Sequence, residues 1–222
     1  MCHDKPDSSA LLREKLSEAF AVTLFDSGSE KCPPKNPDVV FPNLYWTGCW
    51  NQAIHCFPDC DALWVIGGDV SLVEPAHVYR ESIESAMPFG CWSPAIKGRC
   101  RPLMSVDHVM GRPWSVWHLE GVAMAVSRQL INVIDRLPSI NKFCWGLDIW
   151  LCWRSWTAQM RNVLDGRVTL VHPEHCGYDG GAAMREMGEF LKSEIGPRWR
   201  DELRYWSDDF DPNVRGPLKR VQ

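Results

Sequence analysis

The alternation of apolar and polar positions along the chain predicts short strands separated by helices. The clearest strand is the apolar run at residues 62–66, and a second short run ends just before His172. Longer stretches carry apolar residues three and four positions apart, which is the spacing of an amphipathic helix. The expected strands are residues 21–25, 39–41, 62–66 and 167–171, and the expected helices are residues 8–20, 50–57, 74–87, 120–137, 148–164 and 181–195. This order is typical of an α/β protein with a mixed, mostly parallel sheet flanked by helices.

Other stretches fit neither period. Residues 88–114 are rich in proline and glycine and predict a long loop or irregular strands. Asp165 and Gly166 predict a turn ahead of the last strand. We therefore expect three parts, namely an N-terminal helix at residues 1–20, one α/β domain at residues 21–195, and a charged C-terminal tail at residues 196–222.

The composition is that of an ordinary globular protein, with 45% hydrophobic and 23% charged residues among 222. The formal net charge of −4 gives no electrostatic basis for binding nucleic acid, which usually needs a basic face. No apolar run approaches the roughly 18 residues that cross a bilayer. The N-terminal residues are polar and lack the apolar core of a signal peptide. We therefore expect a cytoplasmic protein without a membrane span.

The cysteine content raises one alternative. Ten cysteines in a chain without a secretory signal are expected to be reduced thiols rather than disulfides. Cys56 and Cys60, or the cluster of His172, His175 and Cys176, would suit a structural zinc site. The sequence contains no Cys-x-x-Cys pair, however, which such sites usually include. A structural zinc protein is therefore kept as the least favoured interpretation.

Three ionisable residues stand where α/β proteins place their chemistry. Asp69 and His172 each follow an apolar strand, and Asp148 begins a helix after Trp145 and Gly146. Because active sites of α/β folds form at the carboxyl ends of strands, these side chains are candidates for one site. Two carboxylates and an imidazole would suit a divalent metal ion and a general base.

The order of these motifs resembles the GT-A family of nucleotide-sugar glycosyltransferases, over residues 21–178. The resemblance rests on five short motifs in family order, each of them weak alone: Asp26-Ser-Gly-Ser29, the helix start with Asn51, Gly67-Gly68-Asp69, the expected helix from Glu120, and Trp145-Gly146-Leu-Asp148 followed by His172. The later motifs are also similar to those of the small capsid-modifying glycosyltransferases of chlorella viruses. The resemblance implies a single-domain GT-A-like, Rossmann-like fold.

The resemblance also implies a role for each motif. Asp148 would be the catalytic base, and Asp69 with His172 would bind Mn²⁺ or Mg²⁺. The nucleotide would contact Asp26, Ser27, Asn51, Gly67 and Gly68, and the acceptor side would be lined by Glu120, Trp145 and Gly146. Several of these residues also have a structural alternative: Asp69 and Asp148 as turn or helix caps, Asp26 as a turn residue, and Glu120 as the start of its helix. His172 would alternatively be an ordinary strand-end histidine, and His175 competes for its role.

Two departures from the family pattern bear on activity. Gly67 replaces the first aspartate of the family's Asp-x-Asp motif, and the first twenty residues read as a helix where the family begins with a strand. The leading interpretation is a metal-dependent, inverting glycosyltransferase that moves a sugar from a UDP-sugar donor to a glycan or glycoprotein acceptor. The departures favour the alternative of a degenerate, non-catalytic protein that binds a nucleotide sugar or a glycan.

Overall fold

The computed structural model describes residues 6–42, 45–98, 105, 111–138, 141, 143–173 and 180–208, with side chains described as far as residue 203. The helices are α1 (Pro6–Leu16), α2 (Tyr45–Cys56), α3 (Ala76–Ala86), α5 (Arg128–Ile134), α6 (Leu147–Thr157), α7 (Gly180–Glu194) and α8 (Trp199–Asp208). The strands are β1 (Phe25–Ser27), β2 (Val39–Phe41), β3 (Ala62–Ile66), β4 (Ser71–Leu72), β5 (Cys91–Gly98), β6 (Pro113–Ser115), β7 (Ala123–Ser127) and β8 (Asn162–His172).

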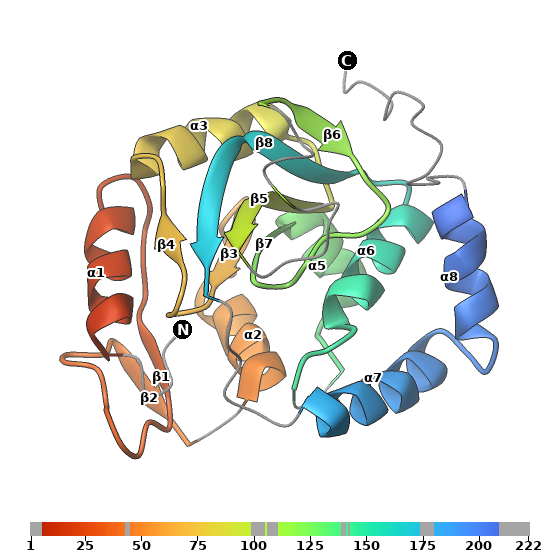
Figure 1. Cartoon of the computed structure of the whole chain (residues 1–222), viewed down its shortest axis with the longest axis horizontal. Helices are drawn as coiled ribbons and strands as arrows, with labels where there is room; N and C mark the ends of the chain where they lie inside the picture. The colour runs from red at the N-terminus through yellow and green to blue at the C-terminus, as the bar shows by residue number, and fades with distance from the viewer. Residues whose placement is uncertain are drawn as a thin grey trace.

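A mixed sheet flanked by helices forms the centre of the molecule (Figure 1), which confirms the expected α/β class. Its strand order is β3-β7-β5-β8-β4, and β6 pairs with β8. The expectation of a mostly parallel sheet is wrong, because β5 with β8 is the one parallel pair that the structure describes in this sheet. The reason is that β7 runs antiparallel between β3 and β5. A separate parallel pair joins β1 to β2.

Alternate residues of the central strands supply two hydrophobic cores, one on each face of the sheet. In β7, Met124 and Val126 face the first core, and Ala123 and Ala125 face the second. The first core is covered by residues of α2, α5, α6 and α7, and the second by residues of α1 and α3. Figure 1 shows α1 and α3 on the side of the molecule opposite α6, α7 and α8. The sheet is thus buried on both faces.

Several expected elements change type or boundary. The strand expected at residues 21–25 lies at Phe25–Ser27, and the expected loop at 88–114 contains the buried strand β5. The helix expected at 120–137 begins as strand β7 before α5 follows. β8 starts at Asn162 and runs through the turn expected at residues 165–166. There the register against β5 shifts between Pro94 and Ala95, so the extra residues form a bulge inside a strand.

Both terminal regions contain a packed helix. Leu12 and Leu16 of α1 are buried in the second core. α8 lies within the expected tail, and Trp199 and Leu203 pack against the first core. Of the helices in the described part of the chain, none combines the length and apolar character needed to cross a membrane.

Candidate functional site

The Gly67–Asp69 turn leads from β3 to β4 and positions a half-buried carboxylate. The Gly67 N–H donates to the carbonyl oxygen of Val122 over 3.3 Å. A Cβ at position 67 would lie only 2.8 Å from Oδ1 of Asp69 and 3.7 Å from the ring of Trp46 in α2. A glycine at position 67 therefore gives the Asp69 carboxylate the space it occupies.

Asp148 lies in the first turn of α6. Its Oδ1 accepts from the N–H of Ile149 over 2.8 Å, and its Oδ2 accepts from the N–H of Gly121 over 3.3 Å. The preceding residue but one, Gly146, has a left-handed backbone with φ of 85°, a conformation that suits glycine. The positive end of the helix dipole favours a carboxylate at this position. The structure therefore holds the Asp148 carboxyl group partly buried at a helix N-terminus.

A short segment ahead of β7 connects these two carboxylates. Gly121 donates to Asp148, and its neighbour Val122 accepts from Gly67. Because adjacent residues make these contacts, Asp148 and the Gly67–Asp69 turn lie at the same edge of the sheet. From the sequence we expected Asp69 and Asp148 to lie in one site, although we expected residues 121 and 122 to be part of a helix.

His172 ends β8 at the same edge. It pairs with Gly98 at the end of β5. The antiparallel pair of Ser71 with Val171 puts the end of β8 beside the start of β4, two residues after Asp69. The competing His175 lies outside the described residues. Within the described ranges no group of three or more His, Cys, Asp or Glu side chains is arranged to hold a metal ion.

Two of the candidate nucleotide contacts hold the turn after β1. Asp26 is buried, and its Oδ1 accepts from both the N–H and the hydroxyl of Ser29, over 3.1 Å and 2.6 Å. The Ser27 side chain hydrogen-bonds to Cys49 of α2, a contact that offsets part of the rise in the Cys49 pKa caused by burial. These contacts fix the turn as a compact unit against α2.

Asn51 has a structural contact at both ends of its side-chain amide. The nitrogen donates to the carbonyl oxygen of Leu137 over 2.9 Å, and the oxygen accepts from the Leu137 N–H over 2.8 Å. This bidentate contact ties α2 to the segment after α5. It makes Asn51 a tether between these elements, so we leave Asn51 out of the nucleotide site proposed below.

The acceptor-side candidates differ in their surroundings. Gly146 is buried, and a Cβ there would meet Met187 of α7 at 2.7 Å, so the close packing of α6 against α7 requires a glycine at this position. Trp145 is half-buried, and its ring lies 3.9 Å from the Cβ position of Gly180 at the start of α7. Glu120 is half-buried next to Gly121, which places it beside the backbone that contacts Asp148.

The structure adds His118 to the site, a residue that the sequence did not single out. Its Nε2 lies 3.5 Å from Oδ2 of Asp148, and the two side chains are 5% and 17% exposed. Burial of Cys144 raises its pKa well above the ordinary thiol value, and the charge of Asp148 adds to the rise. A single histidine within a tryptophan-rich stretch carries no spacing signal, so only the fold could reveal the pair.

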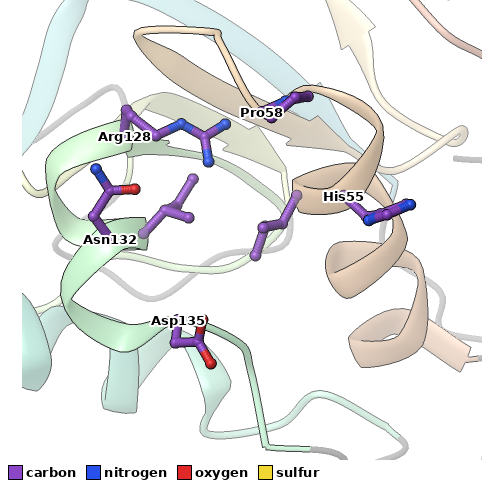
Figure 2. Close-up of a pocket in the computed structure, with 7 residues that line it drawn as sticks. His55, Pro58, Arg128, Asn132 and Asp135 are labelled. Atoms are coloured by element: carbon purple, nitrogen blue, oxygen red, sulfur yellow. The ribbon is translucent and has the colours of Figure 1, made fainter.

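A hollow lies between α2 and α5 (Figure 2), at the edge of the sheet opposite to Asp69 and Asp148. Its volume is about 490 Å³, and its lining residues are Ile54, His55, Pro58, Arg128, Ile131, Asn132 and Asp135. Arg128 donates there to the carbonyl oxygens of Phe57 and Cys60. None of the residues proposed from the sequence lines this hollow, and its arginine is used in holding the loop before β3.

Comparison with known proteins supports the fold. No family model matches the chain, and no curated protein matches it. A crystal structure of GalNAc-T7 with UDP, GalNAc and Mn²⁺ matches with a TM-score of 0.60 and 9% identity, over 92% of this chain and 54% of that one. S. aureus TarS 1-349 in complex with UDP-GlcNAc matches with a TM-score of 0.57 and 11% identity, over 79% of this chain and 57% of that one. The chain thus has the GT-A type of fold and spans little more than half the length of either neighbour.

Proposed function

We propose that this protein is a metal-dependent, inverting glycosyltransferase that uses a nucleotide-sugar donor, namely a UDP-sugar. The observation that carries the proposal is a pair of hydrogen bonds at one edge of a GT-A fold, in which the Gly121 N–H donates to Asp148 and the Gly67 N–H donates to Val122. UDP or UDP-GlcNAc in the solved neighbours supports the choice of donor. The acceptor is a glycan or a glycoprotein.

The donor set suits a metal ion that is shared with a nucleotide. Asp69 supplies a carboxylate and His172 an imidazole from adjoining strand ends, and both side chains are half-buried. Mg²⁺ typically binds one or two carboxylates and completes its shell with phosphate oxygens and water, while Mn²⁺ also accepts imidazole. When bound, such an ion would stabilise the negative charge that develops on the leaving diphosphate.

Asp148 is the proposed general base. It removes the proton from the acceptor hydroxyl as that oxygen attacks the anomeric carbon, and the sugar–phosphate bond breaks on the opposite side of that carbon. The two backbone N–H groups of Gly121 and Ile149 keep the carboxylate in place. A single displacement of this kind inverts the configuration of the sugar. Glu120 and Trp145 would contact the acceptor, Trp145 by stacking on a sugar ring.

Asp26 and Ser27 form the proposed nucleotide side, through the turn that their hydrogen bonds hold against α2. The Gly67-Gly68 backbone would allow a ligand to approach Asp69 closely. A second candidate function is binding of a nucleotide sugar without turnover. It is favoured by Gly67, which stands where the family's motif supplies another carboxylate.

A screen of UDP-sugars tests both functions. The protein is unfolded thermally with UDP-glucose, UDP-GlcNAc or UDP-GalNAc, in Mn²⁺, in Mg²⁺ and in EDTA, and release of UDP is measured with a mixture of glycan acceptors. A donor at 100 times its dissociation constant should stabilise the protein by about 2.7 kcal/mol. Metal-dependent stabilisation with UDP release supports the enzyme, and stabilisation without release supports the binding protein. The absence of both contradicts the proposal.

A further inference from the structure

We propose that His118 is a positioning residue that holds the Asp148 carboxylate in one orientation, through the close polar contact of its Nε2 with Oδ2. The inference rests on the proposed function, in which Asp148 is the base. The two atoms are 3.5 Å apart, and both side chains are largely buried. Oδ2 is therefore approached from two directions, by the imidazole and by the Gly121 N–H.

The backbone on both sides of His118 is anchored. The carbonyl oxygen of Trp117 accepts from Nδ2 of Asn162 over 3.2 Å. The N–H of Leu119 donates to Sγ of Cys152 over 3.3 Å, and Cys152 is one turn after Asp148 in α6. Asn162 also donates to the Cys152 carbonyl over 3.1 Å. The peptide units before and after His118 are thus fixed to α6 and β8. The position of the His118 Cα, from which the imidazole side chain extends, is therefore well defined.

The imidazole ring is restrained by its neighbour as well. The rings of Trp117 and His118 lie 5.0 Å apart at an angle of 35°. Trp117 in turn lines a small hollow with Ile149, Trp153, Trp156 and Leu203. A ring held by an aromatic neighbour on one side and a carboxylate within 3.5 Å has few orientations available. Loss of the imidazole would give the Asp148 side chain more rotational freedom.

The chemistry of the pair explains why a histidine suits this position. An arginine at this position would place a full positive charge beside the carboxylate and weaken it as a base. Asp148 faces the His118 imidazole from α6. Glu120 follows two residues along the same segment, and the thiol of Cys152 accepts from the N–H of the adjacent Leu119. His118 therefore acts through Asp148 and needs no contact with either substrate.

Kinetics of two substitutions test the inference. His118→Leu removes the donor, and His118→Gln keeps an N–H donor. We expect His118→Leu to lower kcat about 10–100-fold, the usual cost of losing a group that orients a functional side chain, with KM for the donor sugar unchanged. His118→Gln should recover most of the activity, and His55→Leu, at the distant hollow, serves as the matched control. Equal activity of wild type and His118→Leu, or equal loss in both variants, would overturn the inference.

A double-mutant cycle separates positioning from a structural role. If His118 acts through Asp148, His118→Leu should cost little further activity when Asp148→Asn is already present. If the loss of activity in the double variant instead equals the product of the losses in the two single variants, the inference would be overturned. The midpoints of thermal unfolding of all variants are measured alongside, so that a loss of folded protein is recognised.

One measurement needs no activity and separates failure of this inference from failure of the proposed function. Nuclear magnetic resonance follows the imidazole signals of the full chain with pH, in wild type and in Asp148→Asn. A carboxylate neighbour favours the protonated imidazole, so half-protonation of His118 should occur at a lower pH in Asp148→Asn. An unchanged value would overturn the inference even if the protein transfers sugar. A protein that shows the shift but turns over no UDP-sugar would contradict the proposed function alone.

Discussion

Asp148 and Asp165 are two aspartates whose carboxylates are buried to different extents and have different hydrogen-bond partners. Asp165 is fully buried in β8 and accepts from the guanidinium of Arg167 at 2.6 Å and 2.9 Å, and also from Ser82 of α3. Asp148 accepts from two backbone N–H groups and lies 3.5 Å from an imidazole nitrogen, and its side chain is 17% exposed. A carboxylate paired with a guanidinium is a poor base, so Asp165 is poorly suited to accept a proton.

The difference extends to the pKa of Asp165. Burial alone would raise the pKa of this carboxyl group, but the hydrogen bonds from Arg167 and Ser82 outweigh burial and lower it below its ordinary value. The comparison therefore predicts that Asp148 contributes to activity and Asp165 to stability.

Asp148→Asn should reduce turnover by about 10²–10⁴-fold, because it removes the group that accepts the acceptor's proton. Stability should change little, since asparagine caps a helix about as well as aspartate, and donor binding should persist. The measurements are UDP release and donor-induced thermal stabilisation. Near-normal turnover in this variant would show that another residue, with Glu120 the first candidate, takes the proton.

Asp165→Ala should lower the free energy of unfolding by about 2–3 kcal/mol. Removing one partner of a buried ion pair costs about 3–5 kcal/mol, and we discount that range because Arg167 is 38% exposed at its side chain. Urea unfolding followed by fluorescence measures the loss. Turnover per folded molecule should match wild type, and a large specific loss of turnover would break the proposed division.

The same carboxylate predicts a pH dependence of stability. Because the pKa of Asp165 is lower in the folded protein than its ordinary value of 3.8, its stabilising contribution is complete above that value. The contribution is lost as the pH falls through the lower, folded value. Urea unfolding between about pH 5 and pH 2.5 should therefore show a steeper loss of stability in wild type than in Asp165→Ala. Parallel curves would mean that the pKa of Asp165 is the same in the folded and unfolded states.

The sequence predicted some strands of the central sheet and missed others. β3 was predicted at its observed bounds because an apolar run followed by two glycines has few alternatives. β5 was missed because Pro94 and Gly98 argue against a central strand, and the structure accommodates Pro94 at a shift in register. β7 was merged with α5 because alanine and methionine are strong helix formers, and only pairing on both sides makes this segment a strand.

The same limits determine which candidate site residues the sequence could indicate. Asp69, Asp148 and His172 were chosen as candidates because each stands at the boundary of an element, where the pattern changes, and the structure places these boundaries at one edge of the sheet. His118 could not be chosen in this way, because its importance depends on a contact 30 residues away in the sequence. Asn51 was selected for its place in a motif, but its amide lies against the backbone of Leu137, 86 residues further along. Such partners depend on tertiary packing, which the periodicity of one chain does not encode.

Two substitutions sharpen the comparison at the proposed metal ligands. Asp69→Ala should weaken Mn²⁺-dependent binding of UDP about 10-fold or more, with little loss of stability at a half-buried turn position. His172→Ala should weaken binding in Mn²⁺ more than in Mg²⁺, because imidazole suits the transition metal better. Isothermal titration with UDP in each metal measures both effects. Unchanged affinity in Asp69→Ala would leave that residue as a turn cap alone.

The smallest expected effect concerns Gly67. A Cβ at this position would lie 2.8 Å from Oδ1 of Asp69, a separation that real Cβ contacts do not show, so the carboxylate would have to turn away. We expect Gly67→Ala to weaken Mn²⁺-dependent UDP binding several-fold, with a stability change within about 1 kcal/mol. Gly188→Ala is the matched control, because a Cβ at position 188 would meet nothing within 4 Å. Gly67→Asp should bind more weakly than wild type for the same steric reason. Tighter binding in Gly67→Asp would instead show that the Asp69 side chain readily adopts another orientation and that a second carboxylate at this turn strengthens metal-dependent binding.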